Sequence, residues 1–318
     1  MVSDSRQRLG KAVMVPVWSS GFIVGTLAVR HASGLSILFW RMSVAALVMA
    51  GICLVMRVEW PRDRRTVLQM VVVGLLLQAA QFVGIFLALE HGVSAGLTAL
   101  LAGSSPLIVA VLATFLLDEH LKRIQWIGSV VGVAGVVFAV IESLNGGGSA
   151  IGFVFAVIGL AGLVGGTLVQ RVGGVNVDPR AGLTIQLIVA TAVIAPLTAL
   201  TSNFDLSAQA LAPLVWLTLG LSIGAVMLFF WLLKREKSGE ATSFLYLVPA
   251  TTAIAGVPVL GQSLQVGAVI GLALAFVGVR MVSSPDKLVP FRRAKPRLST
   301  DGSEPRSEPP RKLSPEST

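Results

Sequence analysis

Residues 96–136 read GLTALLAGSSPLIVAVLATFLLDEHLKRIQWIGSVVGVAGV, and residues 239–279 read GEATSFLYLVPATTAIAGVPVLGQSLQVGAVIGLALAFVGV. The offset that places Gly96 on Gly239, which we call the repeat shift, aligns the two stretches without a gap, with nine identities over 41 pairs. Aliphatic matches arise easily in so apolar a sequence. One matched proline and three matched glycines are harder to explain by chance: Pro106/Pro249, Gly96/Gly239, Gly128/Gly271 and Gly135/Gly278. The sequence therefore predicts an internal repeat.

The repeat lies in a chain that is too apolar for water. Of 318 residues, 54% are hydrophobic and only 13% are charged, and the mean hydropathy is +0.81. Roughly 20 apolar residues make one helical crossing of a bilayer, and hydrocarbon leaves exposed backbone groups unsatisfied. Long β-type alternation is absent, so we expect an all-α membrane protein with ten transmembrane helices. They are predicted near residues 12–29, 35–56, 67–89, 93–117, 124–141, 150–170, 181–200, 210–233, 241–260 and 265–283.

The distribution of basic residues tests this layout. With the N-terminus in the cytoplasm, 23 of the 25 Lys and Arg residues fall on the cytoplasmic side. Arg30 lies in an outer loop, and Arg41 lies within a predicted span. A wrong number of helices would scramble this partition. We therefore expect a multi-pass protein of the cell inner (plasma) membrane, with both termini cytoplasmic.

Four parts of the chain follow from the spans and the repeat. They are a cytoplasmic segment (1–11), a first five-helix repeat (12–141), a second five-helix repeat (150–283) and a basic, proline-rich cytoplasmic tail (284–318). The tail has little to bury and is expected to be disordered. Because five is odd, the second repeat enters the membrane inverted relative to the first, and such 5+5 repeats place the solute site between the halves.

Several short motifs in this order resemble the EamA-type branch of the drug/metabolite transporter superfamily, over about residues 12–283. The motifs are Trp18-Ser19-Ser20-Gly21-Phe22, Phe39-Trp40-Arg41, Leu87-Ala88-Leu89, Ser105-Pro106-Leu107, Asp118-Glu119-His120-Leu121, Gln125-Trp126-Ile127-Gly128, Leu247-Val248-Pro249, Gly261-Gln262-Ser263-Leu264 and Gly271. The resemblance implies ten helices in a 5+5 inverted repeat, a central cavity and export of amino acids or related metabolites. The family pattern usually has a glutamate after its fourth and ninth helices. Glu119 fits the first position, but Gln262 stands at the second.

Arg41 is the sharpest candidate for substrate binding. It lies about six residues, or roughly 9 Å, into the second span. A membrane-embedded arginine costs at least about 2.5 kcal/mol on insertion scales, so it should face protein or water. It either binds a substrate carboxylate with its guanidinium fork, or reaches the outer headgroups, or forms a structural bond to backbone carbonyls.

Each of the remaining candidate site residues has two possible roles. Polar stripes suit either a cavity lining or hydrogen bonds between helices, and they comprise Gln78 and Gln81 in the third span and Ser94, Thr98 and Ser105 in the fourth. Three aromatic residues, Trp18, Trp40 and Tyr246, form either cavity walls or interfacial anchors. Glu90 is either a gate or a solvated helix end. The matched Pro106 and Pro249 either kink their helices or free carbonyls for solute.

Transport without ATP is the function that these features favour. No Walker or Gly-rich phosphate loop follows a strand. The single cysteine, Cys53, and three histidines near loops form no metal or catalytic constellation, so we expect neither cofactor nor enzymatic activity. The expected partners are a small solute and lipid but no nucleic acid, and the oligomeric state, a homodimer included, stays open. The alternatives are a same-fold carrier for drugs or other solutes and a membrane enzyme or scaffold.

Reporter fusions provide a direct measurement of the predicted topology. Fusions after residues 32, 62, 91, 120, 145, 176, 204, 236 and 262 should alternate, beginning outside the cell, because each crossing reverses the direction of the chain. Tags on the two ends that appear on opposite faces of the membrane would contradict the ten-helix layout.

Overall fold

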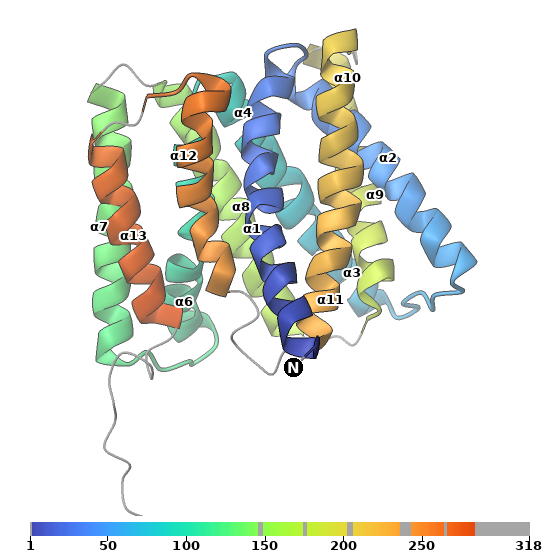
Figure 1. The fold of residues 1–318 in the computed structure, drawn as a ribbon. Helices are drawn as coiled ribbons and strands as arrows, with labels where there is room; N and C mark the ends of the chain where they lie inside the picture. The colour runs from blue at the N-terminus through green and yellow to red at the C-terminus, as the bar shows by residue number, and fades with distance from the viewer. Residues whose placement is uncertain are drawn as a thin grey trace, which may run out of the picture. The chain divides into compact units, whose positions relative to one another are not determined.

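The computed structural model describes residues 2–145, 149–173, 177–201, 206–235, 243–263 and 266–283. The predicted tail, 284–318, lies outside the described residues. Throughout the described ranges the secondary structure is helical, without strands, as the composition predicted. The start of α1 and the end of α13 lie at the same end of the bundle (Figure 1).

The helices follow the predicted spans closely, with several spans divided into shorter elements. In chain order they are α1 (Val2–Val29), α2 (Gly34–Val55), α3 (Arg64–Val73), η1 (Gly74–Ala80), α4 (Gln81–Glu90), α5 (Ala95–Gly103), α6 (Ser105–Leu116), α7 (Arg123–Asn145), α8 (Ala150–Gly173), α9 (Pro179–Thr201), α10 (Ala208–Val215), η2 (Trp216–Ala225), α11 (Val226–Arg235), η3 (Ser243–Leu247), α12 (Val248–Leu260) and α13 (Val266–Ser283).

Nine helical segments in the described ranges are long and apolar enough to cross a membrane. The tenth predicted span, 241–260, is represented by a shorter apolar helix, Leu245–Leu260. At most 44% of the most apolar window of any span is buried within the protein. The remaining apolar surface, which includes Leu47, Phe115 and Leu200, is exposed and suits a lipid environment. The chain is therefore a multi-pass membrane protein.

Side-chain caps begin several of the helices. The side chains of Ser33, Asp63 and Ser94 accept hydrogen bonds from backbone N–H groups in the first turns of α2, α3 and α5. Such caps satisfy N–H groups that have no partner inside the helix. The hydrogen bonds from Thr66 lower the pKa of Asp63, which favours its charged form at the positive end of α3.

Interruptions of the helices recur at positions related by the repeat shift. The π-helical segment η1 covers 74–80, and η2 covers 216–225, which includes the shifted range 217–223. The breaks at Ser104 (φ −79°, ψ −10°) and Leu247 (φ −80°, ψ −14°) have nearly the same backbone angles and the same spacing. The sequence match therefore extends to local backbone geometry.

The ends of α6 and α12 are also related by the repeat shift. Asp118 and Gly261 both have positive φ, 54° and 68°, which reverses the chain direction. The next N–H then reaches the carbonyl six residues earlier, from Glu119 to Ala113 at 3.4 Å and from Gln262 to Gly256 at 3.3 Å. Since the backbone closes both loops, the Gln262 side chain is not required for this geometry.

Glycines bring α7 and α13 into backbone contact (Figure 1). A Cβ on Gly128 would lie 2.9 Å from the Gly278 carbonyl oxygen, and one on Gly135 would lie 2.8 Å from that of Gly271. From the first contact to the second, the residue number rises in α7 and falls in α13, so the two helices are antiparallel. The contacts are also reciprocal, because the repeat shift exchanges the two pairs.

Two further antiparallel pairs connect the halves. In α5 and α12, Gly96 lies against Ala253 and Gly103 against Pro249. In α2 and α9, the Cys53 Sγ lies 3.5 Å from the Thr184 Oγ1, and the Thr198 hydroxyl donates to the Leu35 carbonyl at 3.3 Å. Cys53, the single cysteine, is buried and forms no disulfide.

The α7–α13 contact can be tested by adding one methyl group. We expect Gly278→Ala to lower the thermal unfolding midpoint of the purified protein, because its Cβ would lie 2.5 Å from the Gly132 Cα, and overpacking costs about 1–3 kcal/mol. Gly51→Ala is the matched control, since no atom lies within 4 Å of the added Cβ. Equal midpoints for the two variants would show that this contact does not limit stability.

Candidate functional site

Arg41 lies in the bundle interior, where three spans meet. Only 6% of the residue is exposed. Its Nε donates a 2.9 Å hydrogen bond to the Oγ of Ser222 in η2. The guanidinium carbon lies 4.6 Å from the centre of the Phe82 ring and 5.9 Å from that of the Phe86 ring, both in α4. The headgroup-reaching alternative therefore does not describe this side chain, which points into protein.

The charge on Arg41 has no counter-ion within the described part of the chain. A guanidinium carries five N–H donors, and here Nε has the single hydrogen bond to Ser222. Neither terminal nitrogen bonds to a described residue. The ion pairs found in the described ranges, Arg171–Glu119 and Arg180–Asp178, lie elsewhere. An unpaired charge inside a membrane protein indicates a functional site and favours an anionic ligand.

Gln78 and Gln81 lie on the span that carries Phe82. Both are partly buried, and their side-chain amides form no hydrogen bond with a described residue. The prediction that they share one face assumed α-helical spacing throughout. This assumption is wrong, because Gln78 lies in the π-helical η1, whose wider turns change the angle between the two positions.

The predicted stripe of Ser94, Thr98 and Ser105 is also divided. Ser94 caps α5, and the buried Thr98 donates to the Ser94 carbonyl at 3.0 Å. The break at Ser104 ends α5, so Ser105 begins a different helix, α6. A continuous face from 94 to 105 therefore does not exist. Ser94 instead lines a small cavity of about 40 Å³ with Gln262 and Ser263.

The three aromatic candidates do not gather around Arg41. Trp18 of α1 packs edge-on against Phe229, with ring centres 5.8 Å apart. The Trp40 side chain is 38% exposed, since neighbouring positions on a helix point about 100° apart and Arg41 is the one turned inward. The Tyr246 hydroxyl bonds to the Ser283 hydroxyl at 2.7 Å, and its ring packs against the cluster of Leu107, Val279 and Val282.

The Glu90 carboxylate is bound to the N-terminal end of α2. Its Oε2 accepts a 2.9 Å hydrogen bond from the N–H of Gly34, the first residue of α2. This places a carboxylate at a helix N-terminus, where the helix dipole favours it. The contact explains the position of Glu90 without a gating role.

Pro106 and Pro249 both occupy the second position of a helix, in α6 and α12. Proline is tolerated there because the missing N–H would have no partner inside the helix. Two carbonyls near these breaks accept side-chain hydrogen bonds. The Ser104 hydroxyl donates to Leu101 at 2.7 Å, and the Ser19 hydroxyl of α1 donates to Val248 at 3.2 Å.

Sequence reasoning missed the residues that surround Arg41, namely Ser222, Phe82 and Phe86. Each looks like an ordinary residue of an apolar span, and no local pattern distinguishes it. Glu142 was also missed, because α7 continues to Asn145 instead of ending near 141. One of its oxygens accepts from the Gly267 N–H at 2.9 Å, while the other is buried without a partner.

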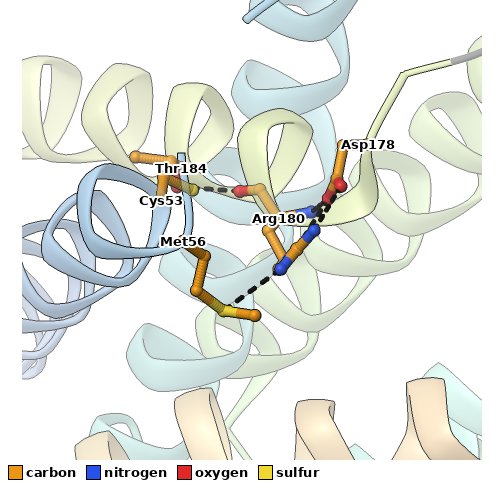
Figure 2. Close-up of polar contacts among 5 residues, drawn as sticks. All are labelled: Cys53, Met56, Asp178, Arg180 and Thr184. Atoms are coloured by element: carbon orange, nitrogen blue, oxygen red, sulfur yellow. Dashed lines mark hydrogen bonds and ion pairs between the residues drawn. The ribbon is translucent and has the colours of Figure 1, made fainter. Parts of the chain in front are cut away.

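A second hollow, of about 620 Å³, lies at the predicted cytoplasmic ends of α2 and α9. Its charged lining residues are Arg57, Glu59, Asp63, Asp178 and Arg180. Figure 2 shows how this junction is held. Arg180 bonds to both carboxylate oxygens of Asp178, at 2.9 and 2.6 Å, and its Nη1 lies 3.1 Å from the Met56 sulfur. The charges compensate each other here, in contrast to Arg41.

A family model and a solved structure match almost the whole membrane part of the chain. The model of the EamA-like transporter family matches residues 12–141 and 150–284. A solved crystal structure superposes with a TM-score of 0.58 at 16% identity, covering 89% of this chain and 98% of the other. At this level of identity the structural match concerns the fold.

Two curated relatives match over shorter ranges. The "Uncharacterized transporter YwfM" of Bacillus subtilis (strain 168) is 24% identical over 196 residues, which cover 61% of this chain and 66% of that protein. The "Probable amino-acid metabolite efflux pump" of Salmonella typhimurium (strain LT2) is 29% identical over 134 residues, or 42% of each chain. The matched regions thus span only part of each relative.

Substitution of Glu90 separates a capping role from a gating role. We expect Glu90→Ala to lower the thermal unfolding midpoint, because the Gly34 N–H loses its partner at a cost of roughly 1 kcal/mol. Glu90→Gln keeps an acceptor and should unfold near the wild-type temperature with an unchanged pH profile of transport. A shifted pH profile in the Gln variant would instead support a proton-responsive gate.

Proposed function

Because the chain belongs to the EamA-like transporter family, we propose that it is a secondary transporter that exports small carboxylate-bearing metabolites, amino acids or related compounds, by alternating access. The efflux pump among its relatives is named for amino-acid metabolites, which supports this class of cargo. The uncompensated guanidinium of Arg41 carries the proposal, because it offers a fork of N–H donors to an anion inside the bundle.

The architecture that we propose is ten spans arranged as a 5+5 inverted repeat, with repeats at 12–141 and 150–283. The recurring π-helical segments, breaks and left-handed residues support the duplication. The antiparallel contact between α7 and α13, which are equivalent under the repeat shift, supports the inversion. In this arrangement the shorter helix that contains α12 is the ninth span, and the solute path runs between the repeats.

The orientation that we propose places both termini in the cytoplasm and the chain in the inner (plasma) membrane. The charge distribution supports it, since the predicted cytoplasmic side holds 23 of the 25 basic residues. The shared end of α1 and α13 supports it independently, because an even number of crossings returns the chain to its starting side (Figure 1).

The contacts of Arg41 connect the site to movement of the repeats. Arg41 and Phe82 belong to the proposed first repeat, whereas Ser222 belongs to the second. An anion that binds the terminal nitrogens would therefore bind at a junction of the two repeats, and rocking of one against the other would change its exposure. Transport down a gradient and proton-coupled transport both fit this geometry.

The proposal is tested with the full chain in proteoliposomes and a panel of radiolabelled amino acids. Arg41→Ala should reduce uptake of carboxylate-bearing cargo at least about tenfold, because a hydrogen bond to a charged group contributes about 1.5–3 kcal/mol. The matched control is Arg62→Ala, which removes an exposed loop arginine of the same charge. Unfolding midpoints of both variants should be measured to separate binding from folding.

Two results would contradict the proposal in different ways. Wild-type uptake rates in a folded Arg41→Ala variant would remove Arg41 from the cargo site. A wild-type protein that moves none of the amino acids, but moves amine-bearing drugs that lack a carboxylate, would favour the alternative of a same-fold drug carrier.

A further inference from the structure

The hydroxyl of Ser222 is oriented by the π-helical segment in which it lies. Its O–H donates to the carbonyl of Leu217, five residues earlier, at 3.2 Å. A serine oxygen keeps two lone pairs when its proton is used in this way. The lone pair is therefore available to accept the N–H from Arg41 Nε at 2.9 Å. Both hydrogen bonds are consistent with a neutral serine that holds one edge of the guanidinium.

This hydrogen bond decides which edge of Arg41 remains for a ligand. A guanidinium can present a pair of parallel N–H donors from its side, through Nε and one terminal nitrogen, or from its end, through both terminal nitrogens. Ser222 occupies Nε, whereas neither terminal nitrogen bonds to a described residue. The end-on pair is thus the edge that a planar, two-oxygen group can bind.

Phe82 packs against the guanidinium of Arg41. Its ring centre is 4.6 Å from the guanidinium carbon, within the range of a cation–π contact, and Phe86 lies further away at 5.9 Å. The rings cover the guanidinium without supplying a hydrogen-bond acceptor for it. A ligand oxygen therefore has to approach at the terminal nitrogens.

The site occurs once, although the fold repeats. The repeat shift places Thr184 at the position equivalent to Arg41 and Ala79 at the position equivalent to Ser222. Thr184 uses its hydroxyl to donate to the Arg180 carbonyl at 2.8 Å, and Ala79 has no polar side chain. The second half thus supplies no equivalent guanidinium, which favours cargo with a single anionic group over cargo that needs clustered cations.

We propose that Ser222 is a positioning residue that holds Arg41 for end-on, bidentate binding of one carboxylate group. This inference rests on the proposed function, since it concerns the same site, and it narrows the substrate class to monocarboxylates such as amino acids. The role of Ser222 is to orient Arg41 and not to touch the cargo. Its loss should therefore weaken binding of the carboxylate more than it lowers the maximal rate of transport.

The test compares uptake of an amino acid with uptake of its carboxamide, which lacks the anionic group. The probe is the amino acid of the panel that the wild-type protein transports fastest. Ser222→Ala should raise its KM about tenfold while the maximal rate changes less than about twofold, and the preference for acid over amide should fall by a similar factor. Ser222→Thr, which keeps the hydroxyl, should restore both within about twofold.

A matched control comes from the same helical segment. Thr218→Ala removes a buried hydroxyl of η2 that donates to the Leu214 carbonyl at 2.8 Å and forms no hydrogen bond with Arg41. It should keep the wild-type KM and acid preference. If Ser222→Ala does not fold, Ser222→Cys, which preserves volume but accepts hydrogen bonds weakly, should show the same rise in KM.

The outcomes separate this inference from the proposed function. A wild-type KM and acid preference in the Ser222 variants, together with loss of uptake in Arg41→Ala, would overturn the positioning role and leave the carboxylate site standing. Normal uptake in Arg41→Ala would overturn both. An equal loss in Thr218→Ala and Ser222→Ala would assign the effect to η2 packing and overturn the specific role of Ser222.

Discussion

Hydrocarbon offers no hydrogen bonds, and this constraint governs every departure from a regular helix in the protein. At several interruptions, residues of the same segment supply the hydrogen-bond partners that the regular helix would have provided. In η2 the Ser222 hydroxyl reaches a carbonyl five residues back, and at the break in the fourth span the Ser104 hydroxyl covers the Leu101 carbonyl. Where α6 and α12 end, the backbone N–H groups of Glu119 and Gln262 reach back six residues. The irregular segments are therefore compatible with a membrane interior.

Close packing of small residues holds this bundle together, because lipid provides no hydrophobic drive for helices to associate. The contacts of Gly128 with Gly278 and of Gly135 with Gly271 leave no space for a side chain between α7 and α13. The reciprocity of these contacts accounts for the matched glycines, since glycines at equivalent positions of α7 and α13 line the same helix–helix contact. The loop-closing hydrogen bonds recur in the same register.

Arg41 places a charge in the interior of this apolar bundle. The structure surrounds a buried charge with one hydroxyl and two aromatic rings, and the described ranges provide no carboxylate to balance it. The junction of α2 and α9 near the predicted cytoplasmic side shows the opposite solution, in which Asp178 takes the charge of Arg180 (Figure 2). The contrast between two arginines near the same pair of helices distinguishes a structural ion pair from a ligand site.

The sequence by itself determined the membrane class and the approximate bounds of the spans, and it predicts the period of the proposed repeat. These properties depend on hydropathy, charge and glycine or proline placement along the chain, which are local or periodic. The candidate site was predictable only in its central residue, because an arginine inside an apolar span is conspicuous wherever it occurs. The stripe from Ser94 to Ser105 failed because a break at Ser104 ends α5. The α-helical spacing assumed for Gln78 and Gln81 failed because Gln78 lies in the π-helical η1.

Only the tertiary structure decided which residues meet Arg41. Ser222 lies 181 positions away in the chain, and its side chain reaches Arg41 through the packing of α2 against η2. The same packing turned Trp40 outward and assigned the Tyr246 hydroxyl to Ser283 and the Glu90 carboxylate to the start of α2. Contacts between distant helices depend on how their surfaces fit in three dimensions. The sequence of one span does not show which other helix will pack against it.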